Sequence, residues 1–196
     1  MSETGRVHQK ARTRDALIRA ARELLAQGGT PTVEEVATAA SVSRATAYRY
    51  FPSQTAMLVA TFPEIAEPSL LGENPPADPA ERLEIVAASL ARSAIEHEAE
   101  LRAMLRISLE AGAPKEDLPF RVGRRIVWVA DALSPLRGQM PAAELERLTV
   151  AIASAVGIDS LVWLTDIAGL SRPQAAELMR WSARALLRAA LAEAVG

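Results

Sequence analysis

A cluster of prolines divides this chain into two parts. Five prolines and Gly72 fall between residues 63 and 79. Proline lacks a backbone N–H, and its ring clashes with the preceding helical turn, so no helix can run through this segment. We therefore expect a proline-rich junction at residues 63–78, between a small domain at 13–62 and a larger domain at 79–196.

Helix-forming residues dominate on both sides of the prolines. Ala, Leu, Arg and Glu recur throughout the 196 residues, of which 49% are hydrophobic and only 4% aromatic. These residue types favour helices, and no run of alternating β-branched residues predicts a strand. The expected fold class is all-α, with an N-terminal three-helix domain followed by a larger helical domain.

The residues that are missing exclude several classes of site. The sequence contains no cysteine and only two histidines, His8 and His97, so disulfides, thiol nucleophiles and histidine-based catalytic sets are not expected. The N-terminus lacks the apolar core of a signal peptide. The most apolar segment, residues 150–164, is shorter than a membrane span and contains Asp159. We expect a cytoplasmic protein that is not an enzyme and has no cofactor, no metal site and no membrane contact.

Charge is distributed unevenly, although the net charge is only −2. Residues 1–63 hold eight Lys or Arg and five acidic residues, whereas the remainder holds 14 and 19. A basic N-terminal part concentrates attraction for phosphate at one end of the chain. Because many solvated surfaces differ by this much, charge alone only weakly indicates nucleic-acid binding.

Residues 13–62 predict the three helices of the N-terminal domain and a fourth helix that follows them, preceded by a flexible basic arm at residues 1–12. Thr13 is a candidate N-cap for the first helix, and Gly28 ends it. The remaining helix starts are marked by a capping box and two serine N-caps, at Thr32 with Glu35, at Ser43 and at Ser53.

The segment from Thr32 to Gln54 predicts a helix-turn-helix, in which a tight turn at residues 41–43 joins two short helices. Apolar side chains at helical spacing can pack these helices together, namely Val36, Ala37, Ala40, Val42, Ala47, Tyr50 and Phe51. The opposite face of the second helix then carries Arg44, Ala45, Tyr48 and Arg49.

That outward stripe has chemistry suited to duplex DNA. Arg44, in the first helical turn, can bond bidentately to guanine, and Ala45 can approach a thymine methyl group. Phosphate contacts are expected at Thr32, Tyr48 and Arg49, and phosphate or minor-groove contacts are expected at Arg14 and the arm before it. The alternative is an ordinary pair of amphipathic helices with a solvated basic face, and residue spacing alone does not decide between the two.

The sequence from Thr32 to Ser53, TVEEVATAASVSRATAYRYFPS, resembles the DNA-binding domain of the tetracycline-repressor (TetR) family. Its most specific element is the Thr-X-Tyr-X-Tyr-Phe core from Thr46 to Phe51. Residues 14–29 also resemble the first helix of that family. The all-helical body and the proline-rich junction agree with the family without identifying it.

The resemblance implies a homodimer that binds palindromic, double-stranded operator DNA and represses transcription until a small molecule, here unknown, binds the larger domain. Carried over by position, it implies DNA contacts at Thr32, Ser43, Arg44, Ala45, Thr46, Tyr48 and Arg49. An activator or a ligand-blind regulator would carry the same sequence features. The rival interpretation is an all-α small-molecule-binding protein or enzyme without a DNA role.

Two positions depart from the family pattern. The family usually has Gly where this chain has Ser41, at a turn position that favours a positive φ. It also usually has Lys where this chain has Gln54, which predicts one phosphate contact fewer.

The larger domain predicts five helices, at residues 79–97, 99–112, 117–136, 141–168 and 173–194. By resemblance, the last two helices form the homodimer interface, and ordinary packing within one chain is the alternative. The candidate effector pocket is lined by Met104, Ile107, Phe120, Val127, Trp128 and Trp163, although core packing is the commoner role for each of them. Asp159 is predicted to be either exposed at the surface or a buried partner of an arginine.

Overall fold

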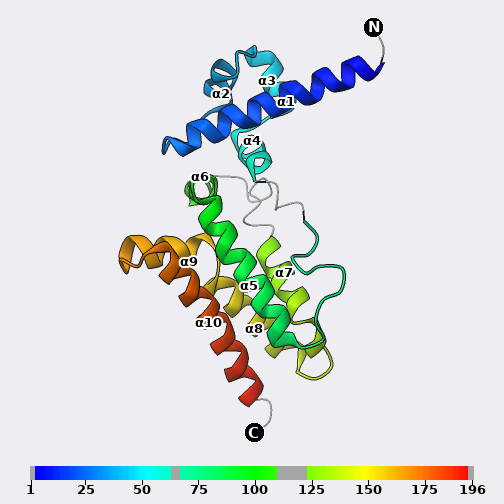
Figure 1. Cartoon of the computed structure of the whole chain (residues 1–196), viewed down its shortest axis with the longest axis vertical. Coiled ribbons are helices and arrows are strands. Elements are labelled where there is room, and N and C mark those ends of the chain that lie inside the picture. The colour runs from blue at the N-terminus through cyan, green and yellow to red at the C-terminus, as the bar shows by residue number, and fades with distance from the viewer. Residues whose placement is uncertain (1–2, 63–66, 110–122, 194–196) are drawn as a thin grey trace. The chain divides into compact units, whose positions relative to one another are not determined.

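The computed structural model describes residues 3–62, 67–109 and 123–193, which form helices joined by turns and irregular segments (Figure 1). No strand occurs within these ranges, and the all-α prediction is confirmed. The chain divides into two compact units. The N-terminal unit contains helices α1 to α4 and α6, and the C-terminal unit contains α5 and α7 to α10.

The N-terminal unit is built on one long helix. Its elements are α1 (Glu3–Ala26), α2 (Val33–Ala39), α3 (Arg44–Tyr50), α4 (Gln54–Thr61) and α6 (Glu98–Leu109). Helices α2 and α4 pack directly on α1, and α3 packs on α2 (Figure 1). A small apolar core joins them, with Leu17, Ala21, Val36, Ala47, Phe51 and Met57 among its buried members.

The first helix is longer than the sequence predicted. The flexible arm expected at residues 1–12 is wrong for residues 3–12, which are the first turns of α1. Thr13 is not an N-cap: its hydroxyl donates to the carbonyl of Gln9 at 3.0 Å, one helical turn back. Such back-bonding satisfies the hydroxyl inside a helix, so a residue that favours helix starts was accommodated in mid-helix.

The other predicted caps are confirmed. Thr32 and Glu35 form both halves of the capping box at α2, and the hydroxyls of Ser43 and Ser53 accept hydrogen bonds at the starts of α3 and α4. Gly28, with φ of 84°, follows the end of α1.

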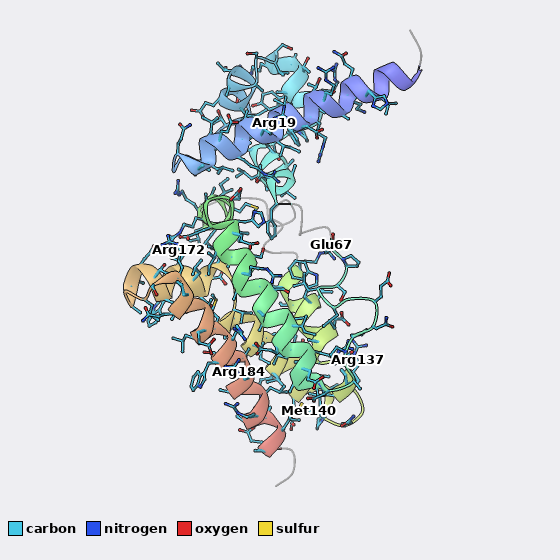
Figure 2. The ribbon with its side chains drawn as sticks, viewed as in Figure 1. Arg19, Glu67, Arg137, Met140, Arg172 and Arg184 are labelled. Carbon is cyan, nitrogen blue, oxygen red and sulfur yellow. The ribbon has the colours of Figure 1, made fainter. Side chains whose placement is uncertain are left out.

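The C-terminal unit is a bundle in which α5 lies along α10 and α8 packs on α10 (Figure 1). Its elements are α5 (Pro79–Glu96), α7 (Arg124–Ala132), the 3-10 turn η4 (Ser134–Leu136), α8 (Ala142–Ala155), α9 (Ile158–Val162), the π-helix η5 (Trp163–Ile167) and α10 (Arg172–Glu193). The turn between η4 and α8 carries Arg137 and Met140 (Figure 2).

The helix predicted at 141–168 is broken, which corrects the sequence prediction. The chain leaves helical geometry at Val156 and Gly157, and Gly157 has φ of 107°. Arg125 of α7 fills the break: one of its guanidinium nitrogens donates to the Val156 carbonyl, and another pairs with Asp159 at 2.7 Å. Asp159 is therefore exposed, as the first alternative predicted, and it also pairs with an arginine. A side chain at Gly157 would displace the Arg125 guanidinium from this break, and the positive φ favours glycine here independently.

Two sets of hydrogen bonds donated by arginines link the helices of the C-terminal unit. Buried Arg82 donates to the carbonyls of Pro76 and Ala132 and to Asp131, which in turn accepts from Ser69 at 2.5 Å. The irregular residues 67–78 are thus tied to helices α5 and α7. On the other side of α5, Glu84 accepts hydrogen bonds from Arg180 and from Arg184 of α10.

The predicted single boundary at 63–78 differs from the observed division, because α6 groups with the N-terminal unit. Within the described residues, no single helix is long and apolar enough to cross a bilayer. The α8 helix and the stretch from α9 through η5 reach that length and composition only when taken together, and the two segments are bent by 45° relative to one another.

Candidate nucleic-acid interface

Helices α2 and α3 are joined by a turn with one left-handed residue. Ser41 has φ of 55°, the only positive φ at a described residue other than glycine. Its N–H donates to the Thr38 carbonyl at 3.1 Å, and the N–H of Val42 donates to the Ala37 carbonyl at 2.9 Å. The predicted positive φ is confirmed, and this turn fixes the angle at which α3 leaves α2.

The small polar residues expected to contact DNA, Thr32, Ser43 and Thr46, form hydrogen bonds at the helix N-termini. The N–H and the hydroxyl of Thr32 both donate to Oε2 of Glu35, at 2.7 and 2.9 Å. These bonds, with the backbone bond the larger cause, lower the pKa of Glu35. At the start of α3, the Ser43 hydroxyl donates to that of Thr46 at 2.9 Å and accepts from its N–H.

The outward stripe of α3 is solvent-exposed, as the sequence predicted. Arg44, Ala45, Tyr48 and Arg49 are all exposed, and the Arg44 side chain retains 73% of its accessible surface. On the opposite face, Ala47 is fully buried and Phe51 closes the helix as a buried C-cap. Helix α3 therefore presents two arginines and a tyrosine while its other face packs into the core.

An acidic residue of α2, which the sequence analysis did not select, contacts two residues of this stripe. Oε1 of Glu34 accepts a hydrogen bond from the Tyr48 hydroxyl at 2.7 Å and pairs with Nη2 of Arg44 at 2.8 Å. The bond from Tyr48 is the largest cause of a lowered pKa of Glu34, and the same bond raises the pKa of Tyr48. Local sequence gives no signal for a contact between residues so far apart along the chain, so sequence reasoning missed it.

Two further arginines lie over aromatic rings. The Arg14 guanidinium carbon lies 5.8 Å from the Phe51 ring centroid, and that of Arg49 lies 5.8 Å from the ring of Tyr50. Both distances permit cation–π attraction. Arg14 thereby connects α1 to the end of α3 while remaining exposed.

The loop before α2 is held by residues from α4 and α6. The Gln54 side-chain amide donates to the carbonyls of Thr30 and Pro31, at 3.1 and 2.9 Å. Arg106 of α6 donates to the Thr30 hydroxyl at 2.7 Å. Gln54, which the sequence analysis treated only as a missing phosphate contact, therefore positions the segment from which α2 starts.

The six predicted pocket residues are not brought together within one unit. Buried Met104 and Ile107 belong to α6 of the N-terminal unit, whereas Val127, Trp128 and Trp163 belong to the C-terminal unit. Phe120 lies outside the described residues. Trp128 is buried and donates from its indole to the Glu67 carbonyl, but Val127 and Trp163 are about half exposed, at 47% and 56%. Within the described ranges, no group of three or more His, Asp or Glu side chains is placed to hold a metal ion.

The helices predicted to form the dimer interface carry both buried and exposed apolar side chains. Leu148, Ile152 and Leu161 are buried within the unit, as intrachain core. Other positions on these segments are exposed and carry large apolar side chains, at Val150, Trp163, Ile167, Leu178 and Trp181. Two open grooves on these helices are lined largely by apolar and small residues, one including Trp163 and Leu178 and the other Leu148 and Leu186.

Comparison with known proteins agrees with this architecture. Residues 17–61 match the family model described as bacterial regulatory proteins, tetR family, and no curated protein matches the chain. A tetR-family transcriptional regulator from Streptomyces coelicolor has a similar structure, with a TM-score of 0.66, 23% identity and coverage of 93% of this chain and 83% of that one. A TetR transcriptional regulator from Rhodococcus sp. RHA1 matches with a TM-score of 0.56, 22% identity and coverage of 91% and 97%. These structural similarities confirm the predicted fold.

Proposed function

We propose that this chain, whose residues 17–61 match the family model of tetR-family bacterial regulatory proteins, regulates transcription by binding operator DNA through α2 and α3. In this proposal the protein acts in the cytoplasm as a homodimer on a palindromic site. It represses transcription, and a small molecule releases it from the DNA.

The exposed stripe on α3 is the observation that carries the proposal. A helix-turn-helix reads DNA when the first turns of its second helix reach base edges in the major groove. Arg44 occupies the first turn of α3, is largely exposed and has a guanidinium that can bond bidentately to guanine. Tyr48 and Arg49, one turn further along, supply hydroxyl and guanidinium donors for phosphates.

The exposed apolar side chains of η5 and α10 support the homodimer. Trp163, Ile167 and Trp181 are each more than half exposed, and large aromatic side chains are typical anchors of protein interfaces. A two-fold protein matches a two-fold operator, with recognition helices about 34–36 Å apart in successive major grooves. The release by a small molecule is supported by the family resemblance, and the proposal assigns no catalytic role to any residue.

A selection experiment tests the proposal. The full-length protein is used to enrich binding sites from random duplex DNA, and fluorescence anisotropy then measures affinity for the enriched site and for a scrambled duplex. We expect an enriched inverted repeat that binds at about 10 nM or tighter. Replacing Arg44 by Ala should weaken that binding by about 1–3 kcal/mol and relax the preference at one base position.

The matched control is Arg92→Ala, because Arg92 is an exposed arginine of α5 in the C-terminal unit. This substitution removes the same charge and should leave the affinity for the enriched site unchanged. Failure to enrich any sequence, or equal effects of the two substitutions, would contradict DNA reading by α3 and favour a binding protein without a DNA role.

A further inference from the structure

One carboxylate oxygen in the helix-turn-helix serves two residues of the recognition helix. Oε1 of Glu34 lies 2.8 Å from Nη2 of Arg44 and 2.7 Å from the Tyr48 hydroxyl. The Arg44 guanidinium carbon also lies 5.6 Å from the centroid of the Tyr48 ring. Three contacts among these three side chains restrict the Arg44 guanidinium, although most of the Arg44 side chain is exposed.

The same geometry leaves Arg44 able to read a base. A guanidinium has five N–H donors, and the ion pair with Glu34 engages only Nη2. The second N–H of Nη2 and the N–H of a neighbouring nitrogen still form an adjacent pair, which is what bidentate recognition of guanine O6 and N7 requires. Glu34 can therefore remain bound to Arg44 while Arg44 contacts a guanine.

The pairing has the opposite effect on binding to phosphates. Non-specific DNA binding comes almost entirely from unpaired cationic side chains that displace counterions from the phosphate backbone. An Arg44 that is already paired with Glu34 contributes less to that attraction, and the carboxylate itself repels phosphate. Specificity is a difference between two affinities, so one acidic residue can raise it by lowering the non-specific term.

We propose that Glu34 is a positioning residue that holds Arg44 for base reading and restrains Arg44 and Tyr48 from indiscriminate contact with phosphates. The proposal rests on the proposed DNA-binding function and names the residue that sets its specificity. It is separate from helix capping, because the α2 capping box is formed by Thr32 and Glu35.

The test compares Glu34→Gln with Glu23→Gln in the full-length protein. Both substitutions remove one negative charge from the N-terminal unit, but Glu23 is an exposed residue of α1. For Glu34→Gln we expect binding to scrambled duplex about fivefold tighter at 0.15 M salt, from roughly one additional released counterion, with a salt slope steeper by about one. We expect binding to the enriched operator to be roughly two- to tenfold weaker, because Arg44 is no longer preorganised.

A spectroscopic measurement follows the contact itself in the absence of DNA. Tyr48 and Tyr50 are the only tyrosines of the chain, so their ring-carbon NMR signals can be assigned and the ionisation of Tyr48 can be followed separately. Since the bond to Glu34 is the largest cause of the raised pKa of Tyr48, Glu34→Gln should lower this pKa and Glu23→Gln should leave it unchanged.

The outcomes separate this proposal from the one on which it rests. If wild-type protein prefers an operator and the two glutamine variants change the operator-to-scrambled ratio equally, Glu34 has no positioning role and only this proposal is overturned. An unchanged Tyr48 pKa in Glu34→Gln would overturn it as well. If wild-type protein binds no duplex preferentially, the proposed function fails and this inference fails with it.

Discussion

Replacing Ser41 by Gly should stabilise the N-terminal unit, because Ser41 is the one described residue other than glycine with a positive φ. The left-handed region costs an L-residue about 1–2 kcal/mol relative to glycine. Glycine also makes the unfolded chain more flexible, which offsets about 0.4–1 kcal/mol of this gain. The side chain of Ser41 is exposed, so few contacts are lost, and the expected net stabilisation is about 0.5–1 kcal/mol.

The assay must report on the N-terminal unit. The three tryptophans, Trp128, Trp163 and Trp181, all lie in the C-terminal unit, so their fluorescence follows that unit during chemical denaturation. Hydrogen exchange of peptides that span residues 33–50 follows α2 and α3 directly. We expect Ser41→Gly to slow exchange in those peptides while the tryptophan transition stays in place.

Gly28→Ala is the matched opposite substitution. Gly28 has φ of 84°, and an added Cβ would meet no heavy atom within 4 Å, so the substitution changes backbone energetics without a collision. It should destabilise the same unit by about 1 kcal/mol or more. If Gly28→Ala has this effect but Ser41→Gly does not slow exchange, the reasoning about strain at Ser41 is refuted.

Two further predictions concern the C-terminal unit. Burial raises the pKa of Glu84, but hydrogen bonds and charge from Arg180 and Arg184 together outweigh burial and leave this pKa below its ordinary value. The contribution of Glu84 to stability is therefore complete above the ordinary carboxyl pKa and is lost as the pH falls through the lowered value, so tryptophan-monitored unfolding of Glu84→Gln should depend less on pH in acid than that of wild type. Trp181→Glu should weaken the proposed dimer by about 2 kcal/mol or more, roughly thirtyfold, in sedimentation equilibrium. Ile85→Glu, at an exposed position on α5, should leave the dimer affinity unchanged. Equal dimer affinities of the two variants would contradict an interface that includes α10.

Features that depend on neighbouring residues were predictable from the sequence. The capping box at Thr32 and the serine caps at Ser43 and Ser53 join residues three positions apart, so the local sequence carries the whole interaction. The positive φ at Ser41 was predictable because the related family usually has glycine there. The same reasoning failed at Thr13, since a threonine can also bond backwards inside a helix, and nothing nearby ends α1 earlier.

Features that depend on distant residues were not predictable. The sequence from 141 to 168 has the apolar periodicity of one helix, and the break at Gly157 is stabilised by Arg125, which lies in another helix. The contact between Glu34 and Tyr48 likewise depends on the angle between α2 and α3. Hydrophobic periodicity reports which face of a helix is buried, and it carries no information about which polar side chains meet across a turn.

The polar residues of the candidate interface therefore divide by what they already bind. Thr32, Ser43 and Thr46 are engaged in caps, so substitutions there change helix stability, by about 1 kcal/mol for a lost N-cap, before they change any DNA contact. Among the residues that the structure describes, Arg44 and Tyr48 are engaged only with Glu34 and with each other. Loss of DNA binding in a Ser43 variant would thus be ambiguous, whereas loss in an Arg44 variant with unchanged hydrogen exchange in α2 and α3 would identify a direct contact.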